Sequence, residues 1–232
     1  MIDNTFVKKM WEKNAKSWKE LSQKGYDVYR DYLNTPAFLE ILPNVEGLNG
    51  LDIACGEGYS TRKVASLGAK MIAIDLSTNF IKYAKEEELN TPLGIEYLEA
   101  DATNLSFKDN KFDFVMSTLA LMDMIEPKKA IKEAYRIIKK GGFFQFSITH
   151  PCFLTSLREW VLDENGNKLG VVCGNYYNNQ PEIEEWIFTS LPEEEKKKHE
   201  TFKIPTTILP ISTWLNNLIE TGFTIEKVVE PR

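Results

Sequence analysis

The sequence predicts an α/β fold with a doubly wound, mainly parallel sheet, an N-terminal helical cover and a β-rich insertion after the fifth strand. Between residues 50 and 148, short apolar runs alternate four times with helical patterns, which favours parallel strands joined by right-handed crossovers. Residues 5–33 carry a single helical stripe of apolar side chains. From residue 151 to 204 the alternation stops and aromatic residues accumulate. We therefore expect one sheet domain with two additions.

Length and composition limit the class of protein. With 232 residues, 43% apolar and 27% charged, the chain suits one α/β domain with an elaboration and is too short for two full domains. A net charge of −6 leaves no basic excess to neutralise phosphates, so we expect no nucleic-acid partner. No apolar run approaches membrane-spanning length and the N-terminus lacks a signal-peptide core, so we expect no membrane partner.

The three cysteines are scattered along the chain and lack C-x-x-C spacing. They are Cys55, Cys152 and Cys173. This pattern predicts neither a disulfide framework nor a zinc site, and we expect no bound metal. A reducing cytoplasm is the simplest location for such a chain.

We expect a single domain over residues 1–232, divided into three parts. Residues 1–48 are the N-terminal helical cover. Residues 49–149 and 205–232 are the sheet core, and residues 150–204 are the insertion.

The expected elements of the core follow one another at regular spacing. Strands are expected at 50–54, 70–74, 95–99, 112–117 and 143–148, with helices at 60–67, 77–88 and 127–139 between them. We expect Ser77 to cap the second of these helices and Lys139–Gly142 to close the third. After the insertion, a helix from Ser212 to Gly222 with Trp214 and Ile219 inward precedes a sixth strand at 223–229. Asn165-Gly166, between two apolar runs, indicates a β-hairpin in the insertion.

The stretch Leu51–Gly58 ends the first strand in an acid and continues through small residues into a helix. Ala54, Gly56 and Gly58 let the backbone come close to a bound nucleoside, and the helix directs its N–H groups into the same crevice. A pyrophosphate loop requires G-x-G-x-x-G, and the third glycine is missing in either register. The carboxylate of Asp52 would repel a pyrophosphate but suits a ligand with an ammonium and a sulfonium group.

The pattern Asp-x-Ala-x-Gly-x-Gly at residues 52–58 resembles motif I of the class I S-adenosylmethionine (SAM)-dependent methyltransferases, with Ala54 in place of the first glycine. Asp101-Ala102, Phe112–Val115 and Lys139–Gly142 are similar to further motifs of that family. The chain looks like a small-molecule type of this family, found among uncharacterised bacterial members. The similarity covers residues 50–149 in detail and residues 206–230 loosely.

This resemblance implies a Rossmann-like fold that binds SAM and releases S-adenosyl-L-homocysteine. It also implies an enzyme that transfers the methyl group to a small-molecule acceptor by in-line displacement. The family's N/D-P-P-Y/F tetrad for exocyclic amines is absent after the fourth strand, which disfavours a nucleobase acceptor.

Acidic residues at successive strand ends should meet at one edge of the sheet and hold the cofactor. Asp75 is expected to accept the ribose hydroxyls, and Leu76 to lie against the adenine. Asp101 is expected to accept the adenine amine. Arg30, or Tyr26, would face the methionine carboxylate if residues 5–33 form a lid rather than a docked helix. The residues expected at the cofactor are Asp52, Ala54, Cys55, Gly56, Gly58, Asp75, Leu76, Asp101, Ala102, Ser117 and Arg30.

The sequence does not identify a catalytic residue. His150 is the better candidate for a general base because it follows the fifth strand, although it could instead cap a turn before Pro151. Asp123 and Tyr176 are weaker candidates.

Three alternatives stay open. The insertion could cover the substrate, or stabilise the fold as a flap and support a homodimer. The protein could be a non-catalytic SAM-binding module with a regulatory role. An NAD(P)-dependent oxidoreductase would share Asp75, but the missing third glycine and the acids Asp52 and Asp101 count against it.

Overall fold

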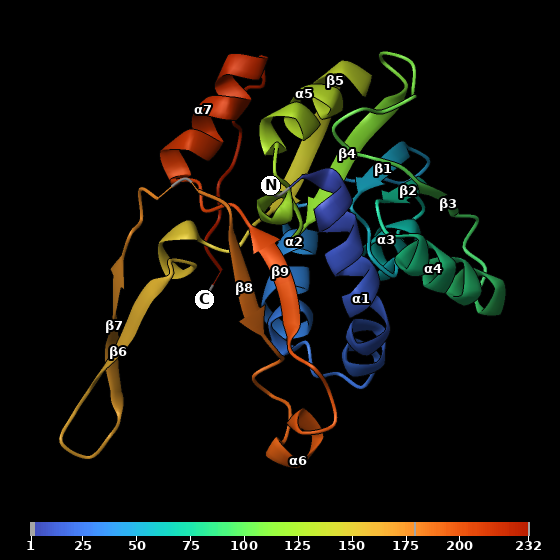
Figure 1. Ribbon diagram of the computed structural model, residues 1–232. Coiled ribbons are helices and arrows are strands. Elements are labelled where there is room, and N and C mark those ends of the chain that lie inside the picture. Colours follow the sequence, from blue (N-terminus) through green and yellow to red (C-terminus); the bar gives the residue numbers. More distant parts are fainter. Residues whose placement is uncertain (1–2, 179, 232) are drawn as a thin grey trace.

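Five parallel strands form the central sheet, in the order β3-β2-β1-β4-β5 (Figure 1). The computed structural model describes residues 3–178 and 180–231. The strands are β1 (Asn49–Ile53), β2 (Lys70–Asp75), β3 (Glu96–Glu99), β4 (Phe112–Thr118) and β5 (Ile138–Ser147). Each neighbouring pair is parallel, which confirms the predicted fold class. The strand order reverses between β1 and β4, where sheets of this type bind their ligands.

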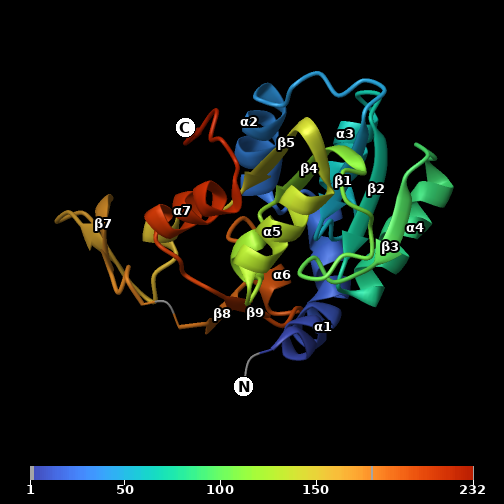
Figure 2. The same ribbon diagram turned by 90° about the horizontal axis from the view of Figure 1, so that it is seen from above.

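Helices cover both faces of the sheet (Figure 2). They are α3 (Tyr59–Ala65), α4 (Thr78–Asn90), α5 (Pro127–Ile137) and α7 (Ile211–Thr221). Ile131 of α5 and Trp214 of α7 belong to the apolar cluster on one face. Val64 of α3 and Ile81 of α4 belong to the cluster on the other. Alternate residues of each strand point to opposite faces, so both sides of the sheet are buried.

The N-terminal segment is broken into three helical pieces, so the prediction of one helix over residues 5–33 is wrong. The pieces are α1 (Asn4–Gln23), the π-helical turn η1 (Arg30–Asn34) and α2 (Thr35–Glu40). Gly25 has a left-handed φ of 80°, a conformation that ends an α-helix. The chain therefore turns back over the sheet after α1.

The insertion forms two antiparallel β-ladders, as its composition predicts. β6 (Leu157–Leu162) pairs with β7 (Lys168–Gly174), and β8 (Glu182–Trp186) pairs with β9 (Phe202–Thr206). Short segments in the same region are α6 (Glu193–Lys196) and the 3₁₀ turn η3 (Pro151–Phe153). The β6–β7 hairpin extends away from the body, whereas β8 and β9 lie beside α1 (Figure 1).

Three predicted features of the C-terminal half are wrong. Residues 223–229 form no strand, so β5 is an edge of the five-stranded sheet in the described part of the chain. Phe223 and Ile225 instead pack against the cluster under α5 and α7. Lys139–Gly142 lies inside β5 rather than closing the preceding helix. Ile219 is 58% exposed, not inward, although Gly222 does end α7 with a left-handed φ of 113°. Over the ranges 3–178 and 180–231, no helix is long and apolar enough to cross a membrane.

Candidate cofactor and acceptor site

A cleft of about 2310 Å³ extends from the carboxyl ends of the sheet strands along the length of β5 to the C-terminal segment. Single ligand pockets usually have volumes of roughly 300–1,000 Å³. The part of the cleft at the strand ends joins the glycine turn to the end of β5, so one cavity connects the expected cofactor and acceptor positions. Its walls come from the glycine turn after β1, the ends of the other strands, the N-terminal cover and the insertion.

The glycine turn adopts the left-handed backbone that its small residues allow. Ala54, Gly56 and Gly58 have φ angles of 58°, 56° and 85°. Ala54, Cys55 and Gly56 line the cleft. Gly58 lies behind it, where an added Cβ would come within 2.5 Å of the Tyr97 hydroxyl. The turn therefore presents backbone to the cleft and packs its third small residue against the sheet.

Asp75 ends β2 and holds the glycine turn in place. Its carboxylate accepts hydrogen bonds from the Gly56 N–H and the Ser77 N–H, both at 2.8 Å. Burial raises the pKa of Asp75 to about 6, against the opposing effect of these two N–H donors. Asp75 and the next residue, Leu76, both line the cleft. Ser77 caps α4 by accepting from the Phe80 N–H, as predicted.

Asp101 and Ala102 line the cleft after β3. The Asp101 carboxylate accepts from the Asn4 side-chain amide at 2.7 Å and from the Thr103 N–H at 2.8 Å. Asn4 begins α1, so the N-terminal cover reaches the expected adenine end of the cleft. The sequence gives no signal for this contact between distant residues.

Asp52 and Ser117 lie beneath the turn and do not line the cleft. Asp52 is fully buried and accepts from the Thr61 hydroxyl at 2.6 Å. Among the described residues, its Oδ1 has no hydrogen-bond partner. Burial raises the pKa of Asp52 to about 7. Ser117 donates to the Ile53 carbonyl at 3.0 Å. Both residues therefore support the strands under the turn.

Arg30 lines the cleft from the N-terminal cover and is paired with the glycine turn. Its Nη1 donates to Glu57 Oε1 at 2.9 Å and its Nε donates to Asp31 at 2.9 Å. The guanidinium also lies 3.8 Å above the Tyr59 ring. Glu57 was not among the expected site residues, yet its bond to Arg30 joins the N-terminal cover to the glycine turn. Tyr26 also lines the cleft.

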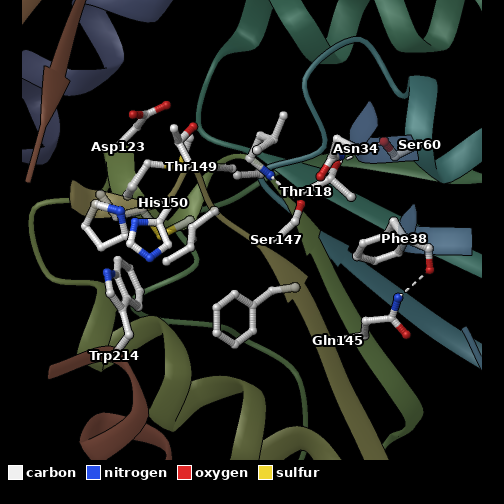
Figure 3. Close-up of a pocket in the computed structure, with 18 of the residues that line it drawn as sticks. Asn34, Phe38, Ser60, Thr118, Asp123, Gln145, Ser147, Thr149, His150 and Trp214 are labelled. Atoms are coloured by element: carbon white, nitrogen blue, oxygen red, sulfur yellow. Dashed lines mark hydrogen bonds between the residues drawn. The ribbon is translucent and has the colours of Figure 1, made fainter. Parts of the chain in front are cut away.

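The acceptor end of the cleft lies past the end of β5 (Figure 3). Asp123, Thr149, His150 and Trp214 gather on one side of this pocket, and Asn34 lies on the other. The Nδ2 atom of Asn34 is buried and has no hydrogen-bond partner in the described part of the chain. Asn34 was not among the expected site residues, because a single amide carries no motif.

His150 makes a contact through each ring nitrogen. Nδ1 accepts from the Cys152 N–H at 3.2 Å, and Nε2 lies 3.3 Å from a Glu230 carboxylate oxygen. His150 thus caps the turn η3, which was the alternative to a role as base. Tyr176 accepts from the Ile211 N–H at 2.8 Å, at the start of α7.

The carboxylate of Asp123, at the acceptor end, has little support from hydrogen-bond donors. It follows β4 and accepts only a long bond, 3.5 Å, from the Thr206 hydroxyl in the described structure. Burial, together with the nearby charge of Glu184, raises the pKa of Asp123 well above its usual range. Leu119, in the same loop, has a left-handed φ of 50°, a strained conformation for a bulky residue. Within residues 3–178 and 180–231, no three or more His, Cys, Asp or Glu side chains are grouped as a candidate metal site.

The comparisons with known proteins agree with this geometry. The family model described as "Methyltransferase domain" matches residues 51–146. Demethylmenaquinone methyltransferase of Renibacterium salmoninarum is 33% identical over 136 residues, which cover 55% of this chain and 56% of that protein. Malonyl-[acyl-carrier protein] O-methyltransferase of Pectobacterium atrosepticum is 32% identical over 136 residues, 58% of this chain and 52% of that protein. The chain thus spans about half the length of these curated relatives.

The structural similarity extends further along the chain. The crystal structure of a SAM-dependent methyltransferase from Mesorhizobium loti has a TM-score of 0.67 and 27% identity, and the match covers 83% of this chain and 81% of that one. The sheet order, the glycine turn and the strand-end acids described above fit the same assignment. Residues 51–146 therefore match the methyltransferase domain family, and the chain shares the fold of a SAM-dependent methyltransferase, which supports SAM as its cofactor.

Proposed function

We propose that the protein methylates a small-molecule acceptor. The observation that carries this proposal is the continuity of the cleft from the glycine turn to Trp214 and His150. The two curated relatives are named for demethylmenaquinone and for malonyl-[acyl-carrier protein]. Because these names differ, the family does not identify the acceptor of this chain.

The residues of the cleft have separate tasks in this proposal. Asp75 accepts the ribose hydroxyls and Asp101 accepts the adenine amine. The Arg30–Glu57 pair closes the cover over the turn. Bound SAM supplies an activated methyl group, so the protein has mainly to align the acceptor and to exclude water. Trp214, Phe146 and Ile148 give the acceptor end apolar walls suited to that task.

Asp123 is better suited than His150 to accept a proton from the acceptor. The Nδ1 lone pair of His150 is used by the Cys152 N–H, so the neutral ring carries its proton on Nε2, towards Glu230. Asp123 is half-buried and desolvation raises its pKa, and a raised pKa makes a carboxylate a stronger base near neutral pH. Asp123 also lines the cleft.

We infer that the cover has two parts, the N-terminal segment and the β8–β9 ladder of the insertion. Asn14 of α1 donates to the Lys203 carbonyl of β9 at 3.0 Å, and Trp18 packs between Trp186 and Phe202. Leu21 lies in the same apolar cluster. These contacts join the proposed parts 1–48 and 150–204, and they support a cover that moves as one unit. Residues 1, 2 and 232 of the proposed domain lie outside the described residues.

The proposal includes no nucleic-acid or membrane partner. We propose a cytoplasmic location, in keeping with the free thiols and the scattered cysteines. We also propose a homodimer through the exposed β6–β7 hairpin, where Trp160 is 53% and Leu169 is 68% exposed. Sedimentation of the full chain tests this assembly.

The function is tested by following the methyl group. Protein incubated with methyl-labelled SAM and pools of small molecules should produce S-adenosylhomocysteine and a labelled product of low mass. The label should depend on an added pool, because the reaction needs an acceptor. A protein that binds SAM but labels nothing in any pool would favour the non-catalytic binding module.

Two variants then assign the proton acceptor. Asp123→Asn should lower turnover by roughly 10²-fold or more, the usual contribution of a general base, with SAM affinity unchanged. His150→Gln is the matched control and should stay within about tenfold of the wild type, since its ring caps a turn. The reverse order of effects would return the role to His150.

A further inference from the structure

The first turn of α1 carries an amide that is bonded inside the expected adenine end of the cleft. The Nδ2 atom of Asn4 donates to Oδ2 of Asp101 at 2.7 Å and lies 3.5 Å from the Thr103 hydroxyl oxygen. All three residues line the cleft. Asn4 and Asp101 are both half-buried, and 97 positions of the chain separate them. This bond therefore fixes the start of the N-terminal cover beside the end of β3.

The two oxygens of the Asp101 carboxylate have different partners. Oδ1 accepts from the Thr103 N–H at 2.8 Å and from the Thr103 hydroxyl at 2.7 Å. Oδ2 accepts from Asn4 alone among the described residues. A ligand amine therefore reaches Asp101 at Oδ2, where no backbone donor has to be displaced, and this is the oxygen that Asn4 occupies.

The Asn4 donor and the adenine amine are the same kind of group. Each is an uncharged, planar N–H₂ on an sp² carbon, with two N–H bonds to donate. Asp101 is the proposed acceptor of the adenine amine, and its Oδ2 already accepts from such a group of the chain itself. The two donors therefore suit the same oxygen.

We propose that Asn4 is a built-in competitor of the cofactor, whose amide holds Oδ2 of Asp101 until the adenine amine displaces it. The inference rests on the proposed function, because it takes Asp101 as the acceptor of that amine. The exchange replaces one hydrogen bond by another of the same kind, so its cost in free energy is small. SAM and S-adenosylhomocysteine carry the same adenine, so Asn4 opposes the binding of both and assists release of the product.

The rest of α1 is anchored at other strand ends, so only its first turn has to move. Lys8 and Glu12 follow Asn4 at four-residue spacing and lie on the same face of the helix. Lys8 pairs with Glu99 of β3. The Glu12 carboxylate accepts from the Thr78 N–H at the start of α4. Neither Lys8 nor Glu12 lines the cleft. Asn4 can therefore turn away while the following turns keep α1 in place.

Calorimetric titration of the full chain with two matched ligands tests the proposal. S-Adenosylhomocysteine has the adenine amine, and S-inosylhomocysteine has an oxygen in its place. Asn4→Ala should bind S-adenosylhomocysteine roughly three- to tenfold more tightly than the wild type does, the effect of one hydrogen bond. Its affinity for S-inosylhomocysteine should not change, because that ligand has no amine to exchange with Asn4. Unchanged or weaker binding of S-adenosylhomocysteine, or an equal gain for both ligands, would overturn the proposal.

Lys8→Ala is the matched control, because it removes an anchor on the same face of α1 and leaves the Asn4 amide on Asp101. Its affinity for S-adenosylhomocysteine should equal that of the wild type. Equal gains in Lys8→Ala and Asn4→Ala would mean that loosening of α1, and not release of Asp101, strengthens binding.

NMR of the isotope-labelled wild type follows the Asn4 amide directly. Its side-chain signals are those that are missing from the spectrum of Asn4→Ala. These protons should exchange slowly with water before ligand is added, and faster once S-adenosylhomocysteine is bound. Protons that stay protected with the ligand bound would contradict the displacement. Both measurements need binding alone, so a failure of the proposed methyl transfer leaves them intact.

Discussion

Replacing Asp75 by asparagine is expected to weaken SAM binding more than tenfold. The carboxylate would accept the ribose hydroxyls, and hydrogen bonds to a charged acceptor contribute roughly 1.5–3 kcal/mol each, where 1.4 kcal/mol is a factor of ten. Asparagine also replaces one of the two oxygens that accept from the Gly56 and Ser77 N–H groups at 2.8 Å. The glycine turn would therefore lose a support as well as a ligand contact. Calorimetric titration measures the loss.

A matched control separates this effect from a general loss of charge. Asp109→Asn removes a carboxylate that is 67% exposed, pairs with Arg136 and lies outside the cleft. Its SAM affinity should equal that of the wild type. Because the pKa of Asp75 is raised to about 6, wild-type affinity should also fall as the pH is lowered through 6 and the carboxylate is protonated. Unchanged affinity in Asp75→Asn would mean that other residues hold the ribose.

Replacing Asp52 by asparagine is expected to stabilise the protein without ligand. Asp52 is fully buried, and one of its oxygens has no partner among the described residues. Its pKa is raised from 3.8 to about 7, so above that pH the folded protein carries a costly buried charge. Asparagine keeps an oxygen for the Thr61 hydroxyl and removes the charge. At pH 8 we expect the free energy of unfolding to rise by about 2–4 kcal/mol.

The stability difference between the wild type and Asp52→Asn should depend on pH, and the direction follows from the raised pKa. Between pH 3.8 and about 7 the folded protein binds the Asp52 proton more tightly than the unfolded chain does. The wild type therefore gains stability from this group as the pH falls, and its deficit against Asp52→Asn should vanish near pH 4. Asp113→Asn is the control of opposite sign, because Lys139 and Asn49 lower the pKa of Asp113. Urea unfolding at several pH values measures both. An Asp52→Asn variant less stable than the wild type at pH 8 would show that the fold needs the charge.

The sequence predicted the features that depend on neighbouring residues. The glycine turn, the Ser77 cap, the Gly222 helix end and the hairpin turn at Asn165-Gly166 each need a particular backbone angle or side-chain oxygen close by in the chain. These local requirements leave a pattern in the sequence. The parallel pairing of the strands follows from the same alternation of strands and helices.

The sequence could not predict features that depend on distant contacts. Residues 223–229 have the composition of a strand, but Phe223 packs against Phe144 and Tyr135 instead of pairing with β5. The Asn4–Asp101 and Arg30–Glu57 contacts also join residues far apart in the chain. Such pairs have no common spacing, so no motif announces them. Asp123 was ranked below His150 for the same reason, since only the fold desolvates its carboxylate and brings it near Glu184.

The cofactor is the basis of the whole account, and calorimetric titration of the full chain tests it most directly. Titration with SAM and with S-adenosylhomocysteine should give saturable heats with micromolar affinity, weakened more than tenfold in Asp75→Asn. NAD and NADP should give no heat of binding, because the glycine turn lacks the third glycine of a pyrophosphate loop and Asp101 faces the cleft. Tight binding of NADH with no heat from SAM would contradict the account.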